Sequence, residues 1–255
     1  MRTQRDLYYW RIFATACSFV FFGLGGLVLG YLVFPLITLF SRSTELAARR
    51  CRYLIHRSFR VFVSFMTVTG VLTWNATGRE LLARPGQLVV ANHPTLIDIV
   101  FLIAMLPNAT CIVKPSLYRN IFTRGPVSRA AYIANDTPEQ LLGDCVKALE
   151  SGATLVIFPE GTRSEKGQPG RFRRGAAYVF LQARCPLILA CIESRPMTLV
   201  KHERWYQIPS CRPRFTLKIK AAKTDNTAEN QQGDYTTARI LTRQWRDYFV
   251  TEVTT

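Results

Sequence analysis

The longest apolar stretch of the sequence lies near its N-terminus, where residues 12–40 carry no charged side chain. A helix of this length rises about 44 Å, which exceeds the ~30 Å hydrocarbon core of a bilayer. A cleaved signal peptide fits poorly, because the run is too long and no Ala-x-Ala site follows it. The pattern therefore predicts a membrane segment over residues 12–40.

Because this segment contains several glycines, its pattern does not decide how it enters the membrane. Gly23, Gly25, Gly26 and Gly30 interrupt the run and Pro35 follows, so one tilted span and a re-entrant hairpin both fit. The Gly26-x-x-x-Gly30 spacing is also a helix-packing pattern. Six arginines follow the segment: Arg42, Arg49, Arg50, Arg52, Arg57 and Arg60. Under the positive-inside rule they predict a cytoplasmic (inner) membrane protein in which the chain after residue 40 lies at the cytoplasmic face.

Residues 44–66 have a helical period and predict a strongly amphipathic helix. One arc is apolar and rich in phenylalanine: Cys51, Leu54, Ile55, Phe59, Val61, Phe62, Phe65 and Met66. The opposite arc is basic: Arg49, Arg50, Arg52, His56, Arg57 and Arg60. This pattern is typical of a helix in the lipid headgroup region. The alternative is a surface helix that packs on the core of its own domain.

From about residue 74 onward, apolar segments of strand length alternate with helical ones. The strand-like segments are residues 87–91, 110–113, 155–158, 187–192 and 215–220. The helical segments are residues 95–106, 138–151, 175–183 and 235–251. This alternation predicts an α/β domain over residues 74–255, with a mixed, largely parallel central sheet flanked by helices. Residues 1–73 then form the membrane-anchoring part.

Composition narrows the choice of partners. Lys and Arg number 33 against 17 Asp and Glu, which gives a formal net charge of +16 and a pI near 10.0. Such a chain is expected to bind a polyanion: nucleic acid, anionic lipid, or an acidic or phosphorylated substrate. The 7 cysteines are scattered and form no Cys-x-x-Cys pair. This argues against a disulfide framework or zinc ribbon and indicates a reducing compartment.

The histidine best placed for chemistry is His93, which directly follows the apolar strand at residues 87–91. Active sites in open α/β sheets lie beyond the carboxyl ends of strands. Pro94 suits a helix start, so Asp98 is expected about one turn inside that helix. Asp98 can accept a hydrogen bond from one ring nitrogen of His93, which leaves the other nitrogen free as a base for a hydroxyl. The alternative is a structural histidine that caps its own helix.

A second polar group follows the strand at residues 155–158. Glu160, Gly161 and Arg163 come at its exit, where glycine permits close backbone approach. Arg163 offers a planar fork for a phosphate, and Glu160 can orient it or hold an acceptor hydroxyl. The alternative is a charged loop whose Glu–Arg pair satisfies itself.

Together these segments resemble the lysophospholipid acyltransferase family, the PlsC-like 1-acylglycerol-3-phosphate acyltransferases. Residues 92–98 (Asn-His-Pro-Thr-Leu-Ile-Asp) are similar to its His-x4-Asp motif, and residues 158–164 (Phe-Pro-Glu-Gly-Thr-Arg-Ser) to its Phe-Pro-Glu-Gly-Thr-Arg-Ser block. Residues 172–176 (Phe-Arg-Arg-Gly-Ala) resemble the Phe-Lys-x-Gly that follows, and residues 185–189 the late proline strand. The resemblance covers about residues 74–222.

The resemblance implies a membrane-bound O-acyltransferase that moves a fatty acyl group from acyl-CoA or acyl carrier protein to a lysolipid hydroxyl, in phospholipid biosynthesis. His93 would be the base and Asp98 its orienter. The substrate-binding residues would be Asn92, Lys114, Glu160, Gly161, Thr162, Arg163 and Arg174. Lys114 or its backbone amide is a candidate for the oxyanion, with an ordinary surface lysine as the alternative. Transfer is direct, so no nucleophile elbow and no cofactor are expected.

One position departs from the family. The second block of the family usually ends in an arginine that helps to bind the acceptor phosphate, and Asn135 stands there in this chain. Arg124 or Arg129 would have to substitute, or the acceptor is another lysolipid or a specialised lipid alcohol.

Other functions remain open from the residues. A non-catalytic, membrane-anchored lipid-binding module would keep the motifs as scaffolding, and an esterase would use His93 with water. A nucleic-acid partner is not expected, because many of the arginines cluster beside the apolar anchor. A metal site is not expected either, since His93 and Asp98 lack a third ligand at suitable spacing.

Overall fold

The computed structural model describes residues 7–135, 138–165, 168–222 and 235–254. Within these residues, seven strands form one sheet in the order β1-β7-β6-β2-β5-β3-β4. Their bounds are β1 Thr73–Thr77, β2 Leu88–Ala91, β3 Ala109–Val113, β4 Ile133–Ala134, β5 Thr154–Ile157, β6 Leu187–Arg195 and β7 Arg214–Ala221. Neighbouring strands are parallel except for β6 and β7. The predicted mixed, largely parallel sheet is confirmed.

The central strands are apolar because both faces of the sheet are covered. Val89 and Ala91 of β2 belong to the core on one face, while Leu88 and Val90 belong to the core on the other. Strands buried on both faces read as continuous apolar runs. This is why β2 and β5 stand out in the sequence.

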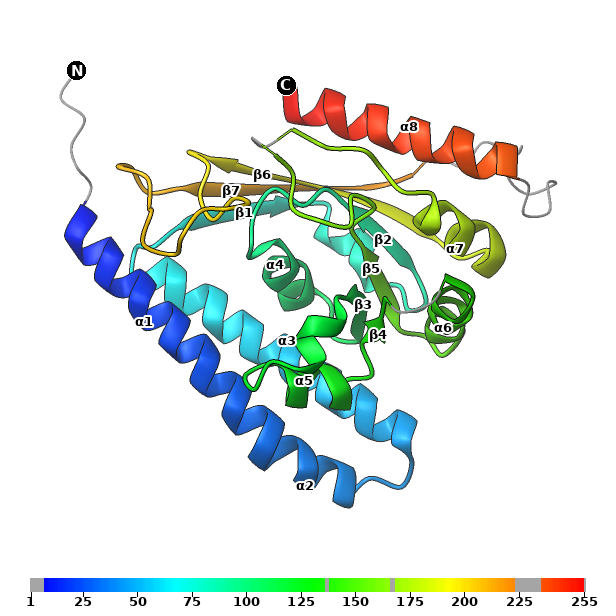
Figure 1. Ribbon diagram of the computed structural model, residues 1–255, viewed down its shortest axis with the longest axis horizontal. Coiled ribbons are helices and arrows are strands. Elements are labelled where there is room, and N and C mark those ends of the chain that lie inside the picture. The colour runs from blue at the N-terminus through cyan, green and yellow to red at the C-terminus, as the bar shows by residue number, and fades with distance from the viewer. Residues whose placement is uncertain (1–6, 136–137, 166–167, 223–234, 255) are drawn as a thin grey trace.

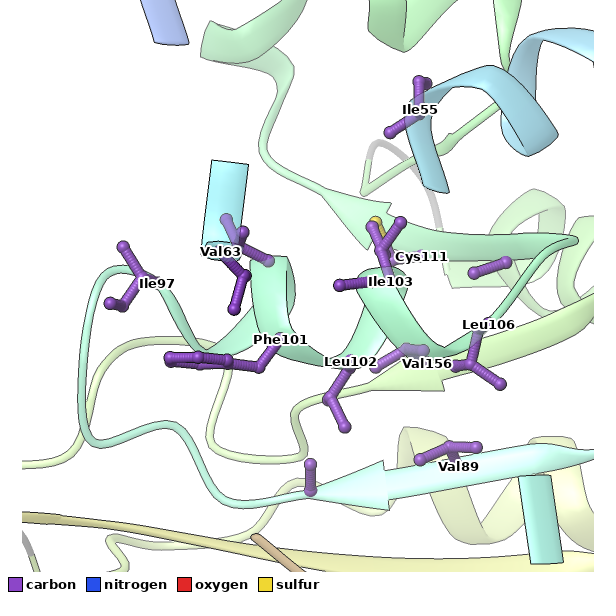
Figure 2. Close-up of a cluster of buried hydrophobic side chains, with 14 of the residues drawn as sticks. Ile55, Val63, Val89, Ile97, Phe101, Leu102, Ile103, Leu106, Cys111 and Val156 are labelled. Carbon is purple, nitrogen blue, oxygen red and sulfur yellow. The ribbon is translucent and has the colours of Figure 1, made fainter. Parts of the chain in front are cut away.

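Helices cover both faces of the sheet and make three layers (Figure 1). On one side lie α3 (Thr44–Val68), α4 (Asp98–Met105) and α5 (Arg124–Arg129), and on the other α6 (Pro138–Glu150), α7 (Gly175–Ala183) and α8 (Tyr235–Thr254). Figure 2 shows the core beneath α4, where Leu102 points toward Val89 of β2 and Ile103 lies near Cys111 of β3. Short 3-10 turns η2 (Arg79–Ala83) and η3 (Pro115–Tyr118) connect the strands.

The N-terminal apolar segment is one continuous helical rod. It runs through α1 (Tyr8–Leu27), a π-helical stretch η1 (Val28–Val33) and α2 (Phe34–Leu39). By length and composition, this rod is sufficient to cross a membrane. The glycines therefore do not fold residues 12–40 back on themselves. Instead the chain turns after α2, and α3 returns beside α1 (Figure 1).

The glycine spacing serves packing against the rest of the chain. A Cβ at Gly30 would lie 2.8 Å from the Cδ of Pro126 and 3.0 Å from the Cα of Gly125. A Cβ at Gly26 would collide with the carbonyl oxygen of Phe122. The Gly26-x-x-x-Gly30 face thus lets the rod pack closely against α5 and the loop that precedes it.

The two arcs predicted for α3 are partly wrong. Arg52 and His56 are buried, whereas Val61 is 58% exposed. The reason is that α3 lies between α1 and α4, so it has buried positions on two sides. Arg52 donates from Nε to Oδ1 of Asn108 at 2.7 Å, and Nδ1 of His56 lies 2.9 Å from the carbonyl oxygen of Ile103. These two residues of the polar arc thus pack on the rest of the chain, while the other four, Arg49, Arg50, Arg57 and Arg60, are exposed.

Candidate active site

His93 and Asp98 form a hydrogen-bonded pair at the carboxyl end of β2. The distance from Nδ1 of His93 to Oδ2 of Asp98 is 2.8 Å. Asp98 is the first residue of α4 and not one turn inside it, as expected from Pro94. The helix begins late because the backbone amide of Thr95 donates to Oδ2 of Asp98 at 2.7 Å and its hydroxyl donates to Oδ1.

The surroundings of the pair fix the ring of His93. Asp98 is fully buried, and burial raises the pKa of its carboxyl, while hydrogen bonds from His93 and Thr95 oppose that rise. The ring of Phe158 stacks on the imidazole with centroids 4.2 Å apart. When Nδ1–H donates to Asp98, Nε2 is left as the acceptor of a proton.

Glu160 is buried and bonds the backbone of His93. Its Oε1 accepts from the backbone amide of His93 at 3.0 Å, and its Oε2 accepts from the amide of Gly170 at 2.9 Å. The Ser164 hydroxyl lies within 2.9 Å of both carboxylate oxygens. The backbone amide of Ser164 in turn donates to the carbonyl of His93 at 2.7 Å. Glu160 thereby ties the loop after β2 to the loop after β5.

The rest of the predicted second site is spread around a basic cleft. The cleft has a volume of about 760 Å³ and takes in Thr162, Arg163, Arg171, Arg173 and Arg174 beside Glu160. Gly161 has a φ of +68°, and its Cβ position lies 3.3 Å from Nε of Arg173, so the Arg173 side chain lies directly over this glycine. Arg163 donates from Nη1 to the carbonyl oxygens of Leu199 and Val200 at 3.0 and 2.9 Å.

Two arginines of the cleft are available for an anion. The side chains of Arg171 and Arg173 are exposed, and within the described residues neither guanidinium has a hydrogen bond or an ion pair. Arg174, one of the predicted substrate-binding residues, also lines the cleft, and its guanidinium lies over the ring of Tyr235 at 4.3 Å. Hydrogen bonding to Arg174 lowers the pKa of the Tyr235 hydroxyl. Arg173 was not among the predicted binding residues, because nothing in the local sequence distinguishes its side chain from that of Arg174.

The remaining predicted residues lie farther from the pair or serve the fold. Nδ2 of Asn92 donates to the carbonyl oxygen of Ile192 at 2.8 Å, and the backbone amide of Ile192 donates to Oδ1 of Asn92 at 2.7 Å. These two bonds hold the end of β2 against β6. Lys114 is exposed at the carboxyl end of β3, two strands from β2. Asn135 is exposed after β4, and Arg129 donates to Thr38 at 2.8 Å.

An apolar cavity of about 330 Å³, here called the inner cavity, lies between the N-terminal helices and the domain. Leu96 and Ile97, from the loop that follows His93, line one part of it. Other lining side chains come from α1 and α3, including Phe19, Phe22 and Phe59. The sequence alone did not reveal it, because its walls come from segments spread over most of the chain.

The fold and the His–Asp pair agree with a match to the family model described as Acyltransferase, which covers residues 74–193. Residues 74–193, just under half of the chain, are thus similar to this acyltransferase family.

Curated relatives are 1-acyl-sn-glycerol-3-phosphate acyltransferases. This chain is 28% identical over 137 residues to the alpha form from Homo sapiens, covering 50% of this chain and 47% of that protein. It is 32% identical over 129 residues to the enzyme from Helicobacter pylori, covering 48% of this chain and 53% of that protein. The matches thus span about half the length of these relatives.

The fold is shared over nearly the whole chain with a solved structure. The crystal structure of the 1-acyl-sn-glycerophosphate (LPA) acyltransferase PlsC from Thermotoga maritima matches with a TM-score of 0.70 at 18% identity. The match covers 95% of this chain and 97% of the other, so it includes the N-terminal helices.

Proposed function

We propose that this protein is a membrane-bound O-acyltransferase. It moves a fatty acyl group from a thioester donor to the hydroxyl of a lysophospholipid such as 1-acylglycerol-3-phosphate, in phospholipid biosynthesis. The observation that carries the proposal is the 2.8 Å contact between His93 and the buried Asp98. Glu160, which bonds the backbone of His93, lines the basic cleft, and Leu96 and Ile97 line the apolar cavity. The curated relatives, named as 1-acyl-sn-glycerol-3-phosphate acyltransferases, support the same reaction.

In this mechanism Nε2 of His93 takes the proton of the acceptor hydroxyl as the oxygen attacks the thioester carbonyl. The C–O bond forms, and the carbonyl oxygen becomes an oxyanion in the tetrahedral intermediate. Collapse of the intermediate breaks the C–S bond, and the imidazolium returns its proton to the leaving thiolate. Asp98 holds the tautomer through Nδ1 and stabilises the imidazolium, while Phe158 fixes the plane of the ring.

The basic cleft would bind the acceptor headgroup. Arg171 and Arg173 line the cleft, and no described residue bonds either guanidinium. A planar fork suits a phosphate. We assign Arg173 in place of Arg174, and we assign Asn92 and Glu160 to holding the loops that carry His93. Adjacent strands are ~4.8 Å apart, so the Lys114 ammonium, and not its amide, is the group that can approach His93 for the oxyanion.

The inner cavity would hold an acyl chain, since its walls are apolar and 330 Å³ is within the usual range of ~300–1,000 Å³ for ligand pockets. The outer face of the rod would lie in the bilayer, because it presents large apolar side chains to the outside. Examples are Phe13, Val20, Leu24, Leu32, Leu36 and Leu39. Arginines after the rod favour the cytoplasmic face of the inner membrane.

The donor would be acyl-CoA or an acyl carrier protein, both of which are anionic. A formal charge of +16 suits either of them as well as the lysolipid phosphate. No nucleic-acid partner is proposed.

The test is thiol release by the detergent-purified full chain, given acyl-CoA or acyl carrier protein thioesters and a panel of lysolipid acceptors, with His93→Ala in parallel. Release that depends on acceptor and falls by about 10²–10⁴-fold in the variant is expected. Release that is independent of acceptor would favour a hydrolase. Lipid binding without release from any pair would favour the non-catalytic module.

A further inference from the structure

The connection between β6 and β7 is much longer than the sheet requires. Arg195 at the end of β6 pairs directly with Arg214 at the start of β7, and antiparallel neighbours can be joined by a two-residue turn. Residues 196–213, here called the strap, make the connection instead, and although all of them are described, none belongs to a helix or strand. Ordered loops of more than about 12–15 residues without secondary structure are usually functional. The strap is therefore expected to do more than join two strands.

The first part of the strap bonds the loop that follows His93. The backbone amide of Leu96 donates to the carbonyl oxygen of Leu199 at 3.0 Å. Nη1 of Arg163 donates to the same oxygen at 3.0 Å and to the carbonyl oxygen of Val200 at 2.9 Å. Leu199 has a φ of +53°, a left-handed conformation that is unfavourable for leucine and persists only where its surroundings hold it. The Arg163 guanidinium and the Leu96 amide are two groups that hold it.

The last part of the strap is bonded by the N-terminal rod. Arg11 of α1 donates from Nη2 to the carbonyl oxygens of Pro209 and Ser210 at 2.8 and 2.6 Å, and from Nη1 to that of Cys211 at 3.3 Å. An arginine at the end of an apolar membrane segment commonly extends toward the headgroups, but Arg11 is only 2% exposed. Burial of a guanidinium is costly unless hydrogen bonds replace its water, so these carbonyl groups favour the buried position of Arg11.

Two arginines thus hold the same strap from different elements: Arg163 from the loop after β5, and Arg11 from the rod. Guanidinium groups suit this task because they only donate, and the carbonyl groups of a loop lack the donors that a neighbouring strand would supply. A further contact joins the strap to the rod, where the ring centroids of Trp205 and Phe19 are 6.1 Å apart. The contacts form a continuous path from the rod, through the strap, to the backbone three residues after His93.

We propose that Arg11 and Arg163 are positioning residues for the reaction, and that they act through the strap on the loop that carries His93. This inference rests on the proposed function, in which His93 is the base. It assigns Arg163, which lines the basic cleft and was predicted to bind substrate, to the strap and not to the acceptor. Loosening the strap would free the bond to Leu96 and widen the range of positions open to His93, and a misplacement of about 1 Å can cost about 10²-fold in rate.

The first test separates positioning from acceptor binding at Arg163. Arg163→Gln is expected to lower kcat by about 10–10²-fold and to leave KM for the lysolipid within about twofold, because this residue does not touch the acceptor. Arg173→Gln, at the cleft arginine assigned to the headgroup, should raise that KM instead. Arg163→Lys should regain part of the lost kcat, since its ammonium can still donate to a strap carbonyl. A raised KM with unchanged kcat in Arg163→Gln would overturn the proposal.

The second test determines whether Arg11 and Arg163 act through the same strap. The double variant Arg11→Gln with Arg163→Gln should have a kcat within about twofold of the more damaged single variant, because either change already loosens the strap. Arg52→Gln is the matched control, since Arg52 is also buried but bonds Asn108, outside the strap. Its effect should multiply with that of Arg163→Gln. Arg11→Lys serves if Arg11→Gln fails to fold. Effects of Arg11 and Arg163 that multiply in folded proteins would contradict a shared strap.

A chemical measurement that requires no turnover separates this inference from the proposed reaction. Diethyl pyrocarbonate modifies neutral imidazole, and peptide mass spectrometry would give its rate at His93 in the detergent-purified full chain. Arg11→Gln and Arg163→Gln should each raise this rate by about threefold or more, because a loose strap lets the loop open more often, and Arg52→Gln should leave it unchanged. If the wild type transfers no acyl group but both strap variants raise the rate, the strap positions His93 and the reaction fails. If the wild type transfers and the rate stays unchanged in these variants, the positioning role fails alone.

Discussion

The carboxylate of Glu160 accepts a hydrogen bond from the backbone amide of His93, with 3.0 Å between Oε1 and N. This contact joins the ends of β2 and β5, which are adjacent parallel strands. A buried charge is retained here because backbone amides and a hydroxyl surround it. In the proposed mechanism, Glu160 therefore positions the backbone of His93 and takes no part in proton transfer.

Glu160→Gln should weaken both the fold and the activity. One carboxylate oxygen becomes an NH₂ group that faces N–H donors, which leaves buried polar groups unsatisfied at a cost of about 1–3 kcal/mol. Thermal unfolding and thiol release would measure the two effects. Glu165→Gln is the matched control, because Glu165 is exposed in the same loop and pairs with Lys201 at 2.9 Å. Equal stability and activity of the two variants would contradict the role of Glu160.

Gly30→Ala should lower the free energy of unfolding by about 1–3 kcal/mol, because the added methyl group would overlap Pro126 and Gly125 where the N-terminal rod packs on α5. Gly25→Ala is the control, since its Cβ would meet nothing within 4 Å. Alanine has a higher helix propensity than glycine, so the control should gain up to about 1 kcal/mol. Thermal unfolding in detergent would compare them. A Gly30→Ala protein as stable as the control would refute the packing account.

His56 should make stability depend on pH. Burial lowers its pKa below the ordinary value of 6.5, against the opposing hydrogen bond to Ile103. The unfolded chain then takes up a proton before the folded one as pH falls. Stability should therefore fall as pH drops below 6.5 toward the folded pKa, and be retained above it.

Unfolding midpoints at about pH 8 and about pH 5 would measure this loss, because the interval spans the histidine range. His56→Gln should reduce the difference between the two midpoints, and His202→Gln, at an exposed histidine, should leave it unchanged. An identical pH dependence in the wild type and His56→Gln would exclude His56 as its source.

Activity should fall with rising salt more steeply for acyl carrier protein than for acyl-CoA. A protein donor presents many charges over a wide surface, and added salt screens their attraction to this basic chain. Initial rates with both donors across a salt series would measure the two slopes. Equal slopes would contradict the expectation.

The fold was largely predictable because its central strands are buried on both faces. β1 (Thr73–Thr77) was missed because it is half polar and is ordered by pairing with β7, far along the chain. β4 (Ile133–Ala134) is only a short edge strand. Arg52 and His56 were expected on an exposed arc of α3. A helical period shows which residues share an arc of the helix, but not how many sides of the helix are covered by neighbouring elements.

The site was predictable where local sequence carries the geometry, as for His93 and Asp98 five positions apart. It was not predictable where tertiary contacts decide between similar side chains. Arg173 lies over Gly161 in the cleft, whereas Arg174 turns to Tyr235. The direction of the Arg174 side chain depends on α8, which begins at Tyr235, and the local sequence does not predict where α8 packs.

The most direct test is the formation of a new acyl ester on 1-acylglycerol-3-phosphate from a labelled thioester, followed by mass spectrometry. Wild type, His93→Ala and Asp98→Asn would be compared after their folding is verified. The account predicts ester formation by the wild type, with losses of about 10²–10⁴-fold in both variants. Ester formation at the wild-type rate by folded His93→Ala would contradict the assignment of His93 as the base.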